Sequence, residues 1–191
     1  MSDKTKQVDG DDDDFFPGDH VVTSKRRAYF DHNIFIGEIG HEDDHLERIN
    51  VIKEAGPDDS IEITITTPGG VIDTALLYVD AIANSEAQIL VKAVGMVASA
   101  GTLIWCLAPN RVAAPFSAFM FHNAQGYIEG DHANMKDNVV FMNEYIESIC
   151  KEAYKEILTP TEFDKIFNGG QVYMTGTDVI ARITQYNKGG K

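Results

Sequence analysis

A pattern of strand, glycine turn and helix occurs twice in the first half of the chain. Residues 61–66 alternate isoleucine with polar side chains, the glycines 69–70 follow, and apolar residues then recur at helical spacing over 72–82. Residues 89–94 form an apolar run that ends in glycine, and the apolar stretch 102–107 predicts a buried helix. Such units close a mostly parallel sheet through right-handed crossovers, so we predict an α/β fold whose glycine turns meet at the carboxyl edge of the strands.

The other elements follow from the same periodicity rules. We expect strands at 29–39, 112–121 and 172–174, and helices at 41–54, 131–157, 161–167 and from Thr177 onward. The long helix carries an apolar stripe at steps of three and four, which we interpret as a subunit interface. Residues 1–20 are interpreted as a flexible acidic tail, and residues 21–187 as a single domain.

Composition fits one soluble globular domain. With 191 residues, 43% of them apolar, the chain can bury one substantial core. Its formal net charge of −14 repels phosphate backbones and anionic lipids, so we expect neither nucleic-acid nor membrane binding. No apolar run approaches the ~20 residues of a membrane span, and the N-terminus lacks a signal-peptide core, which predicts a cytoplasmic protein. Cys106 and Cys150 are expected to be reduced core thiols.

The segment His41–His45 matches H-E-x-x-H, the spacing that places two imidazoles on one helix face in zinc proteases. Here the segment follows Gly40, both of its free positions are aspartate, and no third ligand stands out. Its acidic residues instead fit the first turn of a helix. We therefore expect no metal site, and no other cofactor.

Two residues stand where catalytic groups are found in α/β enzymes. Ser99 follows the strand at 89–94, at a turn into a helix where a hydroxyl projects beyond the sheet edge. His122 ends the predicted strand at 112–121. Taken singly, Ser99 also fits a helix cap, and His122 also fits a packed core histidine. Together they fit nucleophilic catalysis, because a serine hydroxyl needs a neighbouring imidazole to take its proton.

Three segments resemble the signatures of the ClpP-type serine peptidases. Residues 67–71 (TPGGV) resemble S-P-G-G-x-V, residues 95–101 (GMVASAG) resemble G-x-[AS]-[AS]-S-M-[GA], and residues 119–122 (FMFH) resemble the strand that ends in the catalytic histidine. They occur in the family's order, and the resemblance covers roughly residues 26–185. It implies a ClpP/crotonase-like spiral of β-α units, with the helix at 131–157 as a protruding handle.

The resemblance also implies roles for individual residues. Ser99 would be the nucleophile, His122 the base and then the acid, and the amides of Gly70 and Ala100 the oxyanion hole. The family usually has methionine directly after the nucleophile, but Ala100 also supplies a backbone N–H.

The third catalytic position departs from the family pattern. The aspartate expected there falls on Gln171, and the nearest carboxylates in sequence belong to Asp164 and Asp178. Three alternatives follow: a Ser-His pair oriented by Gln171 or by solvent, a carboxylate such as Asp164 that reaches in, or an inactive relative.

The resemblance further implies partners. It predicts a homo-oligomer of heptameric rings that is fed unfolded polypeptide by an AAA+ unfoldase. Phe15, Phe16 and the acidic tail stand where the family has its entrance loops, which suggests a gating role. The departures suggest a specialised or phage-type branch, including capsid maturation peptidases. The alternative functions are an acyl-CoA hydratase or isomerase of the same superfold and a non-catalytic scaffold subunit.

Overall fold

A computed structural model describes residues 29–125 and 131–189. The strands are β1 (Asp31–Ile36), β2 (Ser60–Thr67), β3 (Gln88–Ala98), β4 (Arg111–Ala113), β5 (Ala118–His122) and β6 (Gln171–Thr175). The helices are α1 (Leu46–Glu54), α2 (Ile72–Asn84), α3 (Ala100–Leu107), α4 (His132–Tyr154), α5 (Pro160–Phe167) and α6 (Gly176–Gly189). A short 3-10 turn, η1 (Glu42–Asp44), precedes α1.

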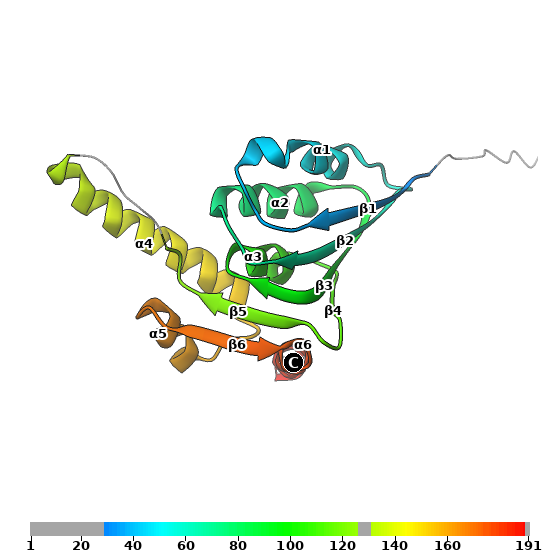
Figure 1. Cartoon of the computed structure of the whole chain (residues 1–191). Coiled ribbons are helices and arrows are strands. Elements are labelled where there is room, and N and C mark those ends of the chain that lie inside the picture. The colour runs from blue at the N-terminus through cyan, green and yellow to red at the C-terminus, as the bar shows by residue number, and fades with distance from the viewer. Residues whose placement is uncertain (1–28, 126–130, 190–191) are drawn as a thin grey trace, which may run out of the picture.

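The strands form one sheet in the order β1-β2-β3-β5-β6, with β4 also paired to β3. All pairs are parallel except β5 with β6, which is antiparallel. Helices α1 and α2 lie side by side above β1 and β2, and the chain winds from them through α3 and β5 to β6 (Figure 1). The predicted mostly parallel α/β architecture is confirmed, and it is consistent with the ClpP fold.

The alternating pattern of β2 explains how the sheet meets its helices. Ile61, Ile63 and Ile65 are buried, whereas the polar residues between them are partly exposed. The same periodicity continues in β3, where Val91 and Ala93 are fully buried. Side chains of successive strand residues point to opposite faces, so one face of these strands builds the core under α1, α2 and α3.

Two strand predictions need correction. The strand at 89–94 does not end at its glycine: β3 continues to Ala98, with Gly95 at φ +64°. From the pair Ile65–Ala93 to the pair Thr67–Val97, the chain advances by four residues in β3 but by only two in β2. The extra residues form a β-bulge that contains Gly95 and bends the strand. The periodicity of the sequence does not predict such a bulge.

The strand predicted at 112–121 is two strands rather than one. A turn interrupts it at 114–117, closed by a 2.9 Å hydrogen bond from the Ser117 N–H to the Ala114 carbonyl. Pro115 lies within this turn and has no N–H to give to a ladder. The pieces β4 and β5 therefore pair with successive parts of β3.

Helix α4 begins and ends close to the predicted range, and it protrudes from the body at its N-terminal end (Figure 1). Val140 and Phe141 in its protruding half are 48% and 65% exposed, whereas Ile146 and Cys150 in its second half are buried. The apolar stripe is thus divided between the domain core and an uncovered surface. The predicted acidic tail at 1–20 lies outside the described residues.

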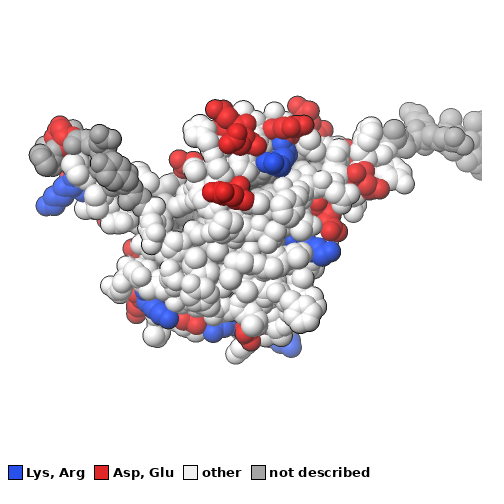
Figure 2. All heavy atoms as spheres, viewed as in Figure 1, with Lys and Arg blue, Asp and Glu red and all other residues white. Residues whose placement is uncertain are grey.

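Charge is unevenly distributed over the surface. Figure 2 shows acidic side chains gathered over α1 and α2, while the face over β5 and β6 is mostly uncharged.

Within residues 29–125 and 131–189, no helix is long and apolar enough to cross a bilayer. Cys106 and Cys150 are free thiols in the core, and burial raises the pKa of Cys150 to about 11.

Candidate active site

Ser99 and His122 meet at the carboxyl edge of the sheet. The Oγ of Ser99 lies 2.7 Å from Nε2 of His122, although the two residues are 23 positions apart. Ser99 stands between the end of β3 and the start of α3, and His122 is the last residue of β5, the next strand in the sheet. Parallel pairing of β3 with β5 brings the two strand ends together.

The backbone at Ser99 forms a sharp, strained turn. Its φ of 55° and ψ of −128° make it the one non-glycine residue with positive φ in the described ranges. Its N–H donates to the Met120 carbonyl at 3.0 Å, and its carbonyl accepts from the Thr102 N–H and hydroxyl at 2.9 and 2.6 Å. The Thr102 hydroxyl in turn lies 2.7 Å from the Tyr154 hydroxyl at the end of α4. Neighbouring elements therefore hold the hydroxyl of Ser99 outward.

The pair faces an open cleft of about 1130 Å³. Ser99 and His122 line it together with Gly70, and its walls include Val139, Met142 and Ile146 of α4. A smaller apolar recess lies behind Ser99 and is lined by Leu103, Ile149 and Cys150, among others. The cleft has room for an extended peptide at the serine, with apolar side chains along one wall.

Gly69 and Gly70 bring a backbone turn against the serine. A Cβ on Gly69, at φ +103°, would lie 2.5 Å from the Cβ of Ser99. A Cβ on Gly70, at φ +144°, would lie 1.9 Å from the carbonyl oxygen of Ile39. Both positions thus require glycine for conformation and for space. The predicted meeting of this glycine turn with Ser99 is confirmed.

The amides of Gly70 and Ala100 have no acceptor within the described chain. The Gly69 N–H donates a hydrogen bond to the Thr67 hydroxyl at 3.0 Å, whereas the neighbouring Gly70 N–H has no acceptor among the described residues. Ala100 is the first residue of α3, and the first amides of a helix lack intrahelical partners. Both amides are therefore available to a ligand at Ser99.

A model of the Clp protease family matches residues 18–177. The chain belongs to the Clp protease family. The family resemblance drawn from the three signature segments is thereby confirmed.

Curated members of the Clp protease family agree with this assignment. The chain is 28% identical, over 142 residues, to ATP-dependent Clp protease proteolytic subunit 2 of Pseudomonas aeruginosa, covering 70% of each chain. It is 30% identical over 104 residues to proteolytic subunit 3 of Rhizobium meliloti, covering 52% of this chain and 53% of that one. A third relative, proteolytic subunit 3 of Rhizobium etli, is 29% identical over the same length.

Within residues 29–125 and 131–189, the imidazole of His122 has one hydrogen bond, which joins its Nε2 to the Oγ of Ser99. Its other ring nitrogen has no hydrogen-bonding partner among these residues. Burial lowers the pKa of His122 below its ordinary value of 6.5. The imidazole is therefore neutral at pH 7 and able to accept a proton.

Gln171, which stands where the family resemblance places the third catalytic residue, is hydrogen bonded to Tyr173 rather than to His122. Gln171 pairs directly with His122 across β5 and β6, but its Oε1 accepts from the Tyr173 hydroxyl at 2.6 Å. Asp178 accepts hydrogen bonds from the backbone N–H and hydroxyl of Thr175 at the start of α6, and no hydrogen bond joins Asp164 of α5 to His122 within the described residues. None of the three side chains hydrogen bonds to the imidazole.

The H-E-x-x-H segment has a different structure from that of a zinc protease. It runs through η1 and ends before α1, so its two imidazoles do not share a helix face. His41 is exposed beside Glu42 and Asp43, whereas His45 is buried. Among the residues described, no group of three His, Cys, Asp or Glu side chains is arranged to hold a metal ion.

The sequence did not indicate the residues that hold the backbone of the site in place through hydrogen bonds. Thr102, Tyr154 and Ile39 each hold a part of it, yet each is apolar or weakly polar and stands in an ordinary core pattern. The hydroxyl of Thr102 three residues after Ser99 is the one local signal, because a threonine in a first helical turn often bonds a nearby carbonyl.

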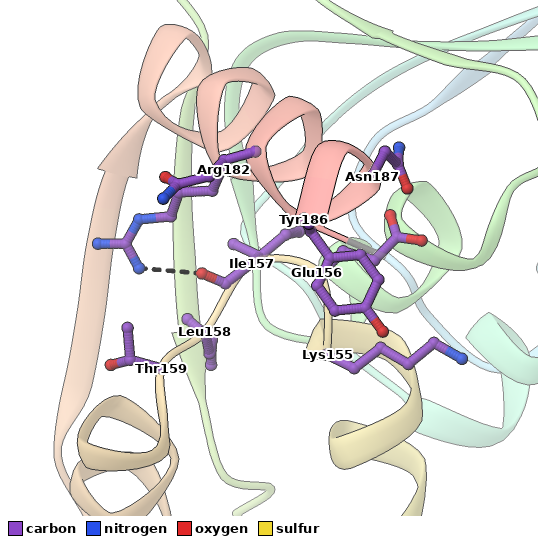
Figure 3. A pocket seen from close by; sticks show the side chains of 10 residues that line it. Lys155, Glu156, Ile157, Leu158, Thr159, Arg182, Tyr186 and Asn187 are labelled. Carbon is purple, nitrogen blue, oxygen red and sulfur yellow. Dashed lines mark hydrogen bonds between the residues drawn. The ribbon is translucent and has the colours of Figure 1, made fainter. Parts of the chain in front are cut away.

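A second hollow of about 940 Å³ lies between α6 and the connection from α4 to α5. In Figure 3, Arg182 reaches from α6 to the carbonyl of Ile157, at 2.9 Å, and Tyr186 and Lys155 flank the opening. Arg182 also forms two hydrogen bonds with the Glu162 carboxylate, which lowers the pKa of Glu162 to about 2. This hollow shares no lining residue with the cleft at Ser99.

Proposed function

We propose that the chain is a serine endopeptidase subunit that cleaves extended polypeptide at Ser99. The 2.7 Å contact between Ser99 Oγ and His122 Nε2, at the floor of an open cleft, is the observation that carries the proposal. The hydroxyl attacks the substrate carbonyl as Nε2 takes its proton, and the imidazolium then gives that proton to the leaving amine. Water repeats the sequence on the acyl-enzyme and releases the second product.

The Gly70 and Ala100 amides are the proposed oxyanion hole. Both are unused by the described chain, and each belongs to a turn that also contacts or adjoins Ser99. Removing one such donor from a protease costs about 3 to 4 kcal/mol of transition-state stabilisation. Ala100 serves as well as methionine here, since the donor belongs to the backbone.

The proposed catalytic group is a Ser-His pair without a carboxylate. Neutral His122 accepts a proton readily, but no described anion stabilises the imidazolium that follows. We therefore expect slow turnover compared with a complete triad. The same observation favours the second candidate function, a non-catalytic subunit that keeps the family fold.

We further infer that the subunit works in an oligomeric chamber. The relatives are named as proteolytic subunits of ATP-dependent Clp proteases, which supports an assembly of several subunits. From the family resemblance we propose that the assembly consists of heptameric rings fed by an AAA+ unfoldase. The uncovered apolar side chains of α4, such as Phe141, fit a contact between rings. Location in the cytoplasm, gating by the tail at 1–20 and a role in phage maturation stay predictions.

A fluorophosphonate probe tests the proposal directly. The assembled protein should be labelled on Ser99 and should hydrolyse short fluorogenic peptides. Ser99→Ala should abolish both, and His122→Gln should slow labelling by at least about a hundredfold. Ser148→Ala, which alters an exposed serine on α4, should change neither. Absence of labelling in the wild-type protein would support the scaffold alternative instead.

A further inference from the structure

His45, the buried histidine of the H-E-x-x-H segment, lies at one end of a hydrogen-bonded path to the glycine turn. It is 4% exposed, and its Nε2 accepts from the Gly40 N–H at 3.1 Å. The Gly40 carbonyl accepts from the Thr74 hydroxyl of α2 at 2.9 Å. Gly40 is thus held on both sides, by residues of two different helical segments.

The peptide unit that joins Ile39 to Gly40 transmits this constraint. Its N–H is the one bound by His45, and its carbonyl accepts from the Val71 N–H at 2.8 Å. A trans peptide is planar, so holding the N–H fixes the direction of the carbonyl at its other side. The imidazole therefore helps to place Val71, the residue after Gly70.

Ile39 also sets the orientation of the Gly70 amide. Its N–H donates to the Gly69 carbonyl at 3.0 Å, and that carbonyl shares a peptide plane with the Gly70 N–H. Because carbonyl and N–H point in opposite directions in a trans peptide, the Gly70 N–H is directed away from Ile39, and Gly70 lines the cleft. Movement of Ile39 would rotate the Gly70 N–H away from the oxyanion position.

The hydrogen bonds require a neutral His45. A backbone N–H can only donate, so Nε2 carries no proton and Nδ1–H donates to the Tyr78 hydroxyl at 3.0 Å. Burial and the nearby Arg48 guanidinium lower the pKa of His45, and the Asp44 carboxylate raises it by a smaller amount. Nη1 of Arg48 lies 3.3 Å from Nδ1, and the fixed positive charge of the guanidinium repels a positive charge on the imidazole.

We propose that His45 is a positioning residue for the oxyanion hole, acting through Gly40 and Ile39 on the Gly70 amide. The expected effect of His45 on catalysis rests on the proposed peptidase function. Its effect on the positions of Val71 and Gly70 does not depend on whether the protein is active. The motif that resembles a zinc site thus serves the cleft through backbone hydrogen bonds.

Two variants and one control separate positioning from general stability. His45→Phe keeps a ring against Tyr78 and removes the acceptor, His45→Gln restores an acceptor near the Nε2 position, and His41→Ala alters the exposed histidine of the same segment. In the assembled protein, His45→Phe should lower kcat about tenfold and leave KM within about twofold. Affinity for a peptide boronate should fall with kcat/KM, because its tetrahedral adduct also uses the hole. His45→Gln should recover most of both, and His41→Ala should match the wild type.

Amide hydrogen exchange gives a readout that does not depend on activity. Fragments containing Val71 should exchange faster in His45→Phe than in the wild type, and His45→Gln should restore protection. Unchanged exchange at Val71, or equal kcat in a folded His45→Phe protein, would overturn the inference. An inactive wild type with altered exchange in His45→Phe would overturn the proposed function and leave the positioning role intact.

Discussion

The Tyr173 hydroxyl donates to Oε1 of Gln171 at 2.6 Å, so the side chain opposite His122 is bound along its own strand rather than to the imidazole. Residues directly opposite each other in an antiparallel pair project from the same face, with Cβ atoms about 5 Å apart. The position expected to hold the third catalytic residue is therefore occupied by a side chain that lies within reach of His122 and binds Tyr173 instead.

Gln171→Asp should raise activity. A carboxylate opposite His122 stabilises the imidazolium formed during attack, so kcat for a short peptide should rise by about tenfold or more. Tyr173→Phe, which frees Gln171 without adding charge, should change kcat much less. A Gln171→Asp protein that folds and assembles but turns over no faster than the wild type would show that a carboxylate at position 171 does not stabilise the imidazolium of His122.

The pH dependence of activity should report the buried imidazole. The base must be neutral, and burial lowers the pKa of His122 below 6.5, so kcat/KM should rise as pH increases and level off before neutrality. Gln171→Asp should move this rise to higher pH, because a nearby carboxylate favours the charged form. Rates of peptide hydrolysis between about pH 5 and pH 8 would check both expectations.

Gly70→Ala should abolish activity. Its Cβ would lie 1.9 Å from the Ile39 carbonyl, so the turn must move and the amide must leave its position. A loss of at least about a hundredfold in kcat is expected from removal of one oxyanion donor. Gly169→Ala is the matched control: this glycine also has positive φ, at +84°, but nothing lies within 4 Å of its Cβ. That variant should cost only modest stability, measured by thermal unfolding, with kcat retained.

Phe141→Asp should weaken assembly. Phe141 is 65% exposed on the protruding half of α4 and stacks on Tyr145 of the same helix, so its apolar surface is available to a second copy. A buried charge at such a contact should shift the sedimenting species to a smaller mass. Asn138→Asp adds the same charge at an exposed polar position of the same helix, and it should leave the mass unchanged. Equal masses for all three proteins would show that α4 is not an assembly surface.

Much of the site could be predicted because it depends on topology. Ser99 and His122 each follow an apolar strand, and parallel strands of one sheet place their carboxyl ends together, so the two residues had to lie near one edge. The glycine pair 69–70 follows β2 in the same way. These inferences need only the order and type of the elements.

The remaining features depend on pairings that local patterns do not encode. The bulge at Gly95 reflects the register between β2 and β3, and the division of β4 from β5 reflects which part of β3 each one meets. The burial of His45 depends on Tyr78, 33 residues away, so its motif alone indicated a helix start or a metal site. Contacts at such sequence separations become visible only in the folded chain.

The backbone at Ser99 has one more consequence, for the balance between stability and chemistry. A side chain in this left-handed conformation costs on the order of 1 kcal/mol or more, and glycine would avoid that cost. Ser99→Gly should therefore increase the free energy of unfolding in urea while removing the nucleophile. The opposite result, a less stable glycine variant, would mean that the hydroxyl's bond to His122 outweighs the strain. Selection for stability alone would favour glycine here, so a serine at this position is expected where its proposed role as the nucleophile outweighs the lost stability.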